Sequence, residues 1–153
     1  MTNTDRLRLV FHGAIVVLIG LLAGLPTTVE VINGSERFWH TAHEALIMIG
    51  IFLLAASSVV PALVLERRER SFLIWSFITM GYGFVVALII GGVAGANAFE
   101  PGDSPAKFTA FVAAIVGIAA AFLATGLTLM GARAALRRAT NGSEGPGVSG
   151  SGD

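Results

Sequence analysis

The chain contains no cysteine, and charged residues make up only 13% of it. The lack of cysteine excludes disulfide bonds, thiolate nucleophiles and cysteine-ligated iron–sulfur clusters. Charge is missing altogether from four long stretches, residues 9–29, 45–65, 71–99 and 108–132. Each stretch reaches or exceeds the roughly 20 residues that a helix needs to cross a bilayer. A soluble domain of 153 residues could not bury a composition that is 54% hydrophobic. The sequence therefore predicts an all-α integral membrane protein, a four-helix bundle in the lipid bilayer.

The predicted bundle forms a single domain over residues 1–138. We expect Pro26 to end or kink the first span and Pro61 to bend the second, because proline removes a backbone donor. Residues 66–70 are expected to form a tight turn between the second and third spans. Residues 139–153 are rich in glycine and serine, and we expect them to be a disordered tail. The predicted spans are residues 8–28, 40–65, 71–97 and 108–132.

Basic residues are distributed unevenly between the two sides of the predicted bundle. The formal net charge is zero, which gives no reason to expect a nucleic-acid partner. Of the ten basic residues, only Arg37 and Lys107 lie in the connections that follow the first and third spans. Because cytoplasmic segments carry an excess of Lys and Arg, we expect both termini in the cytoplasm. The remaining basic residues, all on that side, are Arg6, Arg8, Arg67, Arg68, Arg70, Arg133, Arg137 and Arg138.

Small residues recur at every fourth position in the third and fourth spans. Such stripes let helix backbones approach closely in lipid, where van der Waals contact drives association. They are typical of packing within one bundle, and a seam between subunits is the alternative. The stripes are Thr79, Gly83, Ala87, Gly91 and Gly95 in the third span, and Ala113, Gly117, Ala121 and Thr125 in the fourth.

Two of the three histidines lie at the start of the second span. His40, His43 and Glu44 follow Trp39, which we expect to anchor this span at the membrane interface. On a helix, the spacing of the two histidines and the glutamate allows their side chains to share a face. Three interpretations are open: a metal clamp such as zinc, a single axial imidazole to a haem iron, or two interfacial imidazoles without a specific ligand. A zinc site needs three or four ligands, and the sequence offers no further cluster.

The other polar groups of the spans form no recognisable catalytic set. His12 enters from the other side, on the order of 20 Å in depth from His43, so the two cannot bind one ion. We expect His12 to be a satisfied interfacial histidine. No acid, lysine or arginine lies deep in a span, which counts against a proton-coupled transporter. Any catalysis would then depend on an added cofactor.

Several short motifs follow one another along the chain in a recognisable order. They are His12-Gly13, Trp39-x-x-Ala42-His43, Gly50, Val60-Pro61-x-Leu63 and Gly81-Tyr82. Their order and spacing resemble the styrene-oxide isomerase family of small bacterial membrane proteins, over about residues 6–138. The resemblance implies a multi-pass protein of the bacterial inner membrane, a homo-oligomer that is a trimer in the family, and a bound haem b.

The resemblance also implies an activity and a site. In the family, ferric haem iron acts as a Lewis acid on an epoxide oxygen, and rearrangement gives an aldehyde. The family's axial histidine corresponds to His43, which is therefore the candidate iron ligand and cofactor-binding residue, with His40 and Glu44 as alternative ligands. Three functions stay open: a haem-dependent isomerase of small apolar epoxides, a non-enzymatic bundle or complex subunit, and a small-molecule transporter.

The chain departs from the family pattern at polar positions of the second and third spans, and in the third span Phe84 stands in place of an asparagine. Ile49 and Leu88 stand where the family has an asparagine and a tyrosine. The groups expected to orient an epoxide are therefore apolar here, which would lower rate and selectivity. Tyr82 is a candidate for supplying a catalytic hydroxyl from another position.

Overall fold

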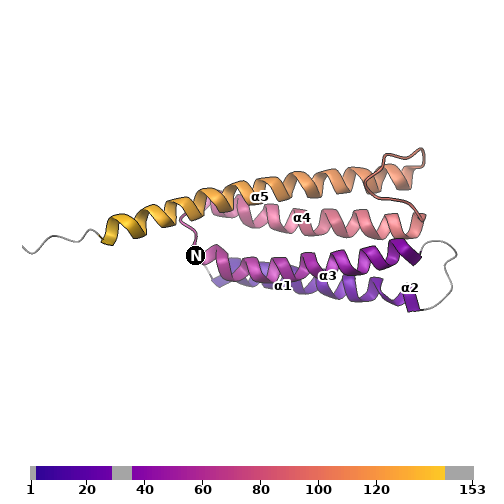
Figure 1. The fold of residues 1–153 in the computed structure, drawn as a ribbon, viewed down its shortest axis with the longest axis horizontal. Helices are drawn as coiled ribbons and strands as arrows, with labels where there is room; N and C mark the ends of the chain where they lie inside the picture. The colour runs from indigo at the N-terminus through magenta and orange to yellow at the C-terminus, as the bar shows by residue number, and fades with distance from the viewer. Residues whose placement is uncertain (1–2, 29–35, 144–153) are drawn as a thin grey trace, which may run out of the picture.

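The computed structural model of the protein describes residues 3–28 and 36–143, and within these ranges every regular element is helical. Four helices are long and apolar enough to cross a membrane, which confirms the all-α bundle with four spans. Figure 1 shows them side by side with their axes roughly parallel, each long helix running opposite to the one before it. In chain order the elements are α1 (Asn3–Ala23), α2 (Leu25–Thr28), α3 (Glu36–Val59), the 3-10 turn η1 (Val60–Ala62), α4 (Arg67–Ala94) and α5 (Pro105–Ser143).

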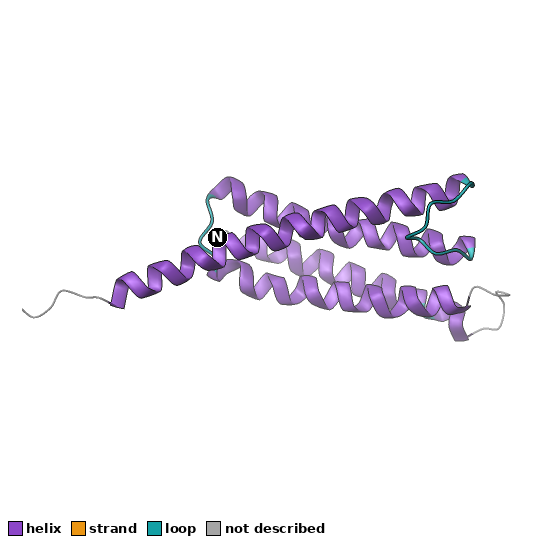
Figure 2. Cartoon of the chain, turned by 45° about the horizontal axis from the view of Figure 1, so that its top comes forward, coloured by secondary structure: helices purple, strands orange, loops and turns teal. Residues whose placement is uncertain are grey.

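The four long helices form two hairpin-like pairs. Helix α1 packs mainly on α3, and α5 packs mainly on α4, while α4 also contacts both α1 and α3. The start of α1, the end of α5 and the α3–α4 connection lie at one end of the bundle, which we call the termini end (Figures 1 and 2). Helix α2 and the α4–α5 connection lie at the other, which we call the loop end.

The break at the end of α1 occurs before Pro26. Helix α1 ends at Ala23, the short α2 begins at Leu25, and the amide of Gly24 donates to Leu21 O at 3.1 Å, in a tighter turn than an α-helix. Proline has no N–H for the carbonyl one turn earlier, so a regular α-helix cannot continue through it. The predicted interruption of the first span is confirmed, and Gly24 is the residue that lies between the two helices.

The α3–α4 connection differs from the predicted bend and turn. Helix α3 ends at Val59, and Pro61 lies in the 3-10 turn that follows, so the proline ends the helix rather than bending it. Helix α4 begins at Arg67, inside the segment predicted to be a turn. A capping box explains this early start, because the side chains of Glu66 and Glu69 each accept from the other's backbone N–H.

Glycines set the close contacts between the paired helices. A Cβ on Gly83 would lie 2.8 Å from Gly117 Cα, so the backbones of α4 and α5 touch there. A Cβ on Gly50 would lie 2.7 Å from Val17 N, which shows the same close approach between α3 and α1. The middle of both predicted stripes therefore packs inside one bundle, while Thr79 and Thr125 are exposed.

The C-terminal helix is longer than its predicted span. Helix α5 continues to Ser143, five residues into the segment expected to be a tail, and Figure 1 shows it projecting beyond the other helices. Residues 144–153 lie outside the described residues.

Candidate functional site

His43 lies in the second turn of α3, half-buried against α1. Its Nδ1 is 2.8 Å from the backbone oxygen of Gly20. A carbonyl oxygen can only accept a hydrogen bond, so Nδ1 carries the proton and donates it. In the neutral imidazole the other nitrogen, Nε2, then holds a lone pair. This arrangement is the usual one for a metal-ligating histidine, whose second nitrogen is oriented by a carbonyl or carboxylate.

The imidazole of His43 occupies space that exists only because residue 24 is a glycine. A Cβ on Gly24 would lie 2.6 Å from His43 Nδ1 and 2.9 Å from Cε1. The break between α1 and α2 thus leaves the space that the ring occupies. Gly20, in the last turns of α1, provides the carbonyl that accepts the hydrogen bond from the ring. Sequence reasoning identified His43 but missed these two glycines; the only signal for Gly24 was its place two residues before Pro26.

The other two predicted ligands do not join His43. His40 Nδ1 and Glu44 Oε2 lie 3.6 Å apart, and their side chains are 62% and 66% exposed. Within the described residues, no group of three or more His, Cys, Asp or Glu side chains could hold a metal ion. The geometry therefore provides one imidazole at this position rather than a multidentate zinc site.

Tyr82 and His12 form a second polar pair, in the other half of the bundle. His12 Nδ1 and the Tyr82 hydroxyl lie 3.0 Å apart, joining α1 to α4. Their rings are T-shaped, with centroids 5.6 Å apart. Gly20, the partner of His43, follows His12 by eight residues on α1, which corresponds to about 12 Å along the helix. Within one chain the Tyr82 hydroxyl therefore serves His12 and not the imidazole of His43.

Trp39 is buried in the bundle rather than exposed at the membrane interface. Its side chain is only 8% exposed, and its ring lies against Gly92 of α4, where a Cβ would come within 3.1 Å. Among the described residues its Nε1 has no hydrogen-bond partner. The expectation of an interfacial anchor was wrong, because the missing side chain at Gly92 admits the indole between the helices.

The sequence matches one known protein family over most of its length. A family model described as styrene oxide isomerase matches residues 5–133, which is most of the chain. The chain belongs to the styrene oxide isomerase family. No curated protein and no solved structure matches it significantly. The match, together with four membrane-spanning helices, makes the chain a multi-pass membrane protein of this family.

Two of the departures from the family pattern lie in the packed interior. Leu88 is 8% exposed and belongs to the main hydrophobic core, and Ile49 is partly buried against the same core. Both side chains are wholly apolar, so neither position can donate a hydrogen bond to a substrate oxygen. This family member therefore carries its candidate ligand, His43, without the polar companions expected from the family pattern.

Proposed function

We propose that the chain is a membrane haem protein in which His43 Nε2 is the axial ligand of haem b. The hydrogen bond from His43 Nδ1 to Gly20 O carries this proposal, because it fixes the tautomer that leaves a lone pair on Nε2. A single oriented imidazole among apolar helices suits haem, which needs one protein ligand and an apolar pocket. The narrow space beside Gly24 supports the proposal further, since it holds the His43 ring in one orientation.

The proposed reaction is the isomerisation of a small apolar epoxide to an aldehyde. Ferric haem would supply the Lewis acid that polarises the epoxide oxygen. The contribution of the chain is to hold the His43 imidazole against α1, in the orientation that Gly20 O and the space at Gly24 allow. Because Ile49 and Leu88 cannot orient a substrate oxygen by hydrogen bonding, we expect slow and unselective turnover.

The proposed assembly is a homo-oligomer, with the family's trimer as the expected number, in the bacterial inner membrane. We propose that the termini end faces the cytoplasm. Eight of the ten basic residues lie at that end, and two, Arg37 and Lys107, lie at the loop end, which is the distribution expected of cytoplasmic and external segments.

The three histidines provide a matched test of the haem site. The protein is purified in detergent, haemin is added, and the visible spectrum is recorded for wild type and for His12→Ala, His40→Ala and His43→Ala. We expect a Soret band in all except His43→Ala. Absence of the band in the wild type, or an unchanged spectrum in His43→Ala, would refute the proposal. An aryl epoxide assay with aldehyde detection then tests the isomerase activity of the haem-loaded protein.

A non-enzymatic bundle, or a subunit of a larger complex, is the alternative. The apolar Ile49 and Leu88 favour it, because the positions expected to handle a substrate are filled by core side chains. It predicts colourless protein that copurifies with a stable partner after gentle solubilisation, so the same spectrum separates the two functions.

The structure gives little support to a transporter. Hydroxyls inside the spans donate to carbonyls of their own helices, as Ser57 does to Leu54 O at 2.6 Å and Ser76 to Phe72 O at 2.7 Å. Thr128 likewise donates to Ala124 O at 2.8 Å. Hydroxyls used in this way do not line a polar path for a solute.

A further inference from the structure

A large pocket opens at the loop end of the bundle, on a different side of α3 from His43. Its volume is about 630 Å³, and it is bounded by the start of α3, the last turns of α4, the α4–α5 connection and the start of α5. Thr41 lines it from α3, and His43 lies two residues further, about half a turn around the helix. The pocket is therefore separate from the proposed haem ligand.

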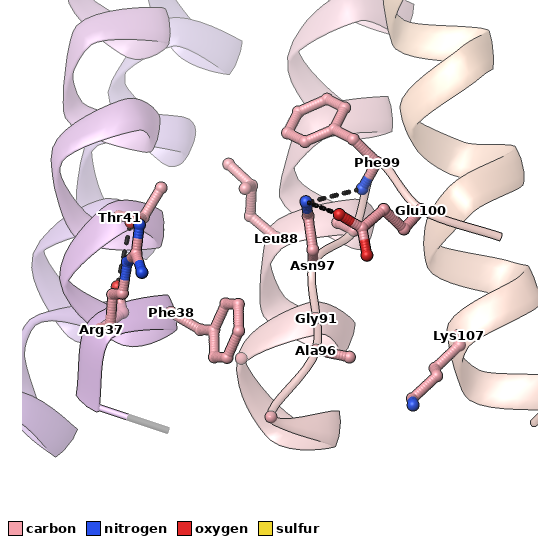
Figure 3. A pocket seen from close by; sticks show the side chains of 13 residues that line it. Arg37, Phe38, Thr41, Leu88, Gly91, Ala96, Asn97, Phe99, Glu100 and Lys107 are labelled. Atoms are coloured by element: carbon pink, nitrogen blue, oxygen red, sulfur yellow. Dashed lines mark hydrogen bonds between the residues drawn. The ribbon is translucent and has the colours of Figure 1, made fainter. Parts of the chain in front are cut away.

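Both basic residues of the loop end line this pocket. They are Arg37 of α3 and Lys107 of α5, and Figure 3 shows them on opposite sides of it. Within residues 3–28 and 36–143 the His40–Glu44 contact is the single ion pair, so neither cation has an acidic partner there. Both positive charges are therefore available to bind a ligand. They are the two basic residues that the loop end carries.

The acid that lines the pocket is already engaged. Asn97 Nδ2 donates to Glu100 Oε1 at 2.9 Å, and Asn97 Oδ1 accepts from the backbone N–H of Phe99 at 3.0 Å (Figure 3). The side chain of Lys107 passes close to Gly102, where a Cβ would lie 2.5 Å from its Cδ. The pocket wall is thus an organised turn, and the charges that line it sum to a net positive value.

A separate apolar groove lies nearer the termini end of the same three helices. Phe38 and Leu88 line the pocket itself, and a second, apolar groove of about 330 Å³ is also lined by α3, α4 and α5. On α3 the two cavities share one face, because Thr41, Phe52 and Val59 are separated by about three turns and two turns. A molecule with an anionic head and an apolar body matches this arrangement, in which a positively charged pocket and an apolar groove lie on the same face of α3.

We propose that this crevice, lined by α3, α4 and α5, binds an anionic phospholipid of the bilayer, with its headgroup in the pocket that Arg37 and Lys107 line. The loop end of a membrane-spanning bundle lies at the level of the lipid headgroups, where an Arg or Lys side chain can form a charge-assisted hydrogen bond with a lipid phosphate. The apolar body of the lipid lies along the grooves toward the termini end, as a free anion could not. Leu88, which stands at the family's tyrosine position, also lines the pocket, so haemin binding of each variant separates a lipid from a haem at this site.

Lipid titration of the full chain tests the proposal. Phosphatidylglycerol, phosphatidylcholine and glycerol phosphate are added separately to detergent-purified protein, and binding is counted by native mass spectrometry and by the shift in melting temperature. We expect phosphatidylglycerol to bind and to raise the melting temperature of the wild type. An exposed ion pair contributes at most about 1 kcal/mol, or roughly fivefold in affinity, so Arg37→Gln with Lys107→Gln should weaken binding by up to about 25-fold.

Matched variants separate this site from general charge attraction. Arg133→Gln with Arg137→Gln removes two exposed charges from α5 at the termini end and should leave phosphatidylglycerol binding unchanged. The charge-preserving pair Arg37→Lys with Lys107→Arg should retain it, and haemin binding should be the same in all variants. Equal binding of phosphatidylcholine or glycerol phosphate, an unaffected Arg37→Gln, Lys107→Gln variant, or an equal loss in the Arg133→Gln, Arg137→Gln control would overturn the proposal.

Discussion

At the residue scale, the position of the His43 ring depends on the absence of a side chain at Gly24. An added Cβ would lie 2.6 Å from Nδ1, so Gly24→Ala must displace the ring or the end of α1. Disturbing the partners that orient a metal-ligating histidine costs about 10- to 100-fold in affinity, and we expect a loss of that size in haemin titrations. Gly126→Ala is the control, since a Cβ there would meet no atom within 4 Å. Equal haemin affinity in the two variants would show that the space beside Gly24 is not required for haem binding.

The contact between His12 and Tyr82 is expected to stabilise the packing of α1 on α4. Hydrogen bonds between membrane helices contribute on average about 0.6 kcal/mol, so Tyr82→Phe should lower the free energy of unfolding by about that amount. A double-mutant cycle with His12→Ala, measured by unfolding in mixed micelles, isolates the pair. Strictly additive losses would mean that the two side chains do not interact. The haemin spectrum should stay unchanged in both single variants.

Residue types pointed to His43, but its neighbours depended on how the helices are rotated. A histidine at the start of an apolar span is conspicuous in the sequence, and its spacing to His40 and Glu44 suggested a shared site. In the structure His43 turns toward α1 and the other two turn to the exposed surface. Trp39 was misplaced for the same reason, because its burial depends on Gly92 of a helix distant in sequence.

At the element scale, the pairing of α4 with α5 rests on backbone contact at Gly83. The nearest atoms to an added Cβ are Gly117 Cα at 2.8 Å and Gly117 N at 2.9 Å, and backbone atoms cannot rotate out of the way. Gly83→Ala should therefore push the helices apart and destabilise the bundle by about 1–3 kcal/mol. The measurement is thermal or denaturant unfolding in detergent. Gly126→Ala should be neutral or slightly stabilising, because alanine favours a helix and has free space there.

The existence of the helices was predictable, whereas several of their ends were not. Uncharged stretches of sufficient length define membrane helices, because the bilayer core offers no partner for a free backbone group. The ends of the helices lie outside the bilayer core, where local hydrogen bonds determine the residue at which a helix begins or ends. The capping box at Glu66 and Glu69 starts α4 inside a charged segment, and α5 extends to Ser143 although its last turns are polar.

At the scale of the whole molecule, the distribution of basic residues predicts the orientation in the membrane. The chain has no native cysteine, so single cysteines can be introduced without background. Asp103→Cys marks the loop end and Ala139→Cys the termini end. In intact cells a membrane-impermeant maleimide should label the first and not the second, with both labelled after lysis. Labelling of Ala139→Cys alone in intact cells would reverse the proposed topology.

The pairing of α1 with α3 and of α4 with α5 bears on how the protein is made. In each pair the two helices are successive long helices of the chain, so their interface joins segments synthesised one after the other. The first hairpin can therefore close in the membrane before the second has been made. The contacts that join the two hairpins, mainly those of α4 with α1 and α3, can form only once the first hairpin and α4 are both in the membrane.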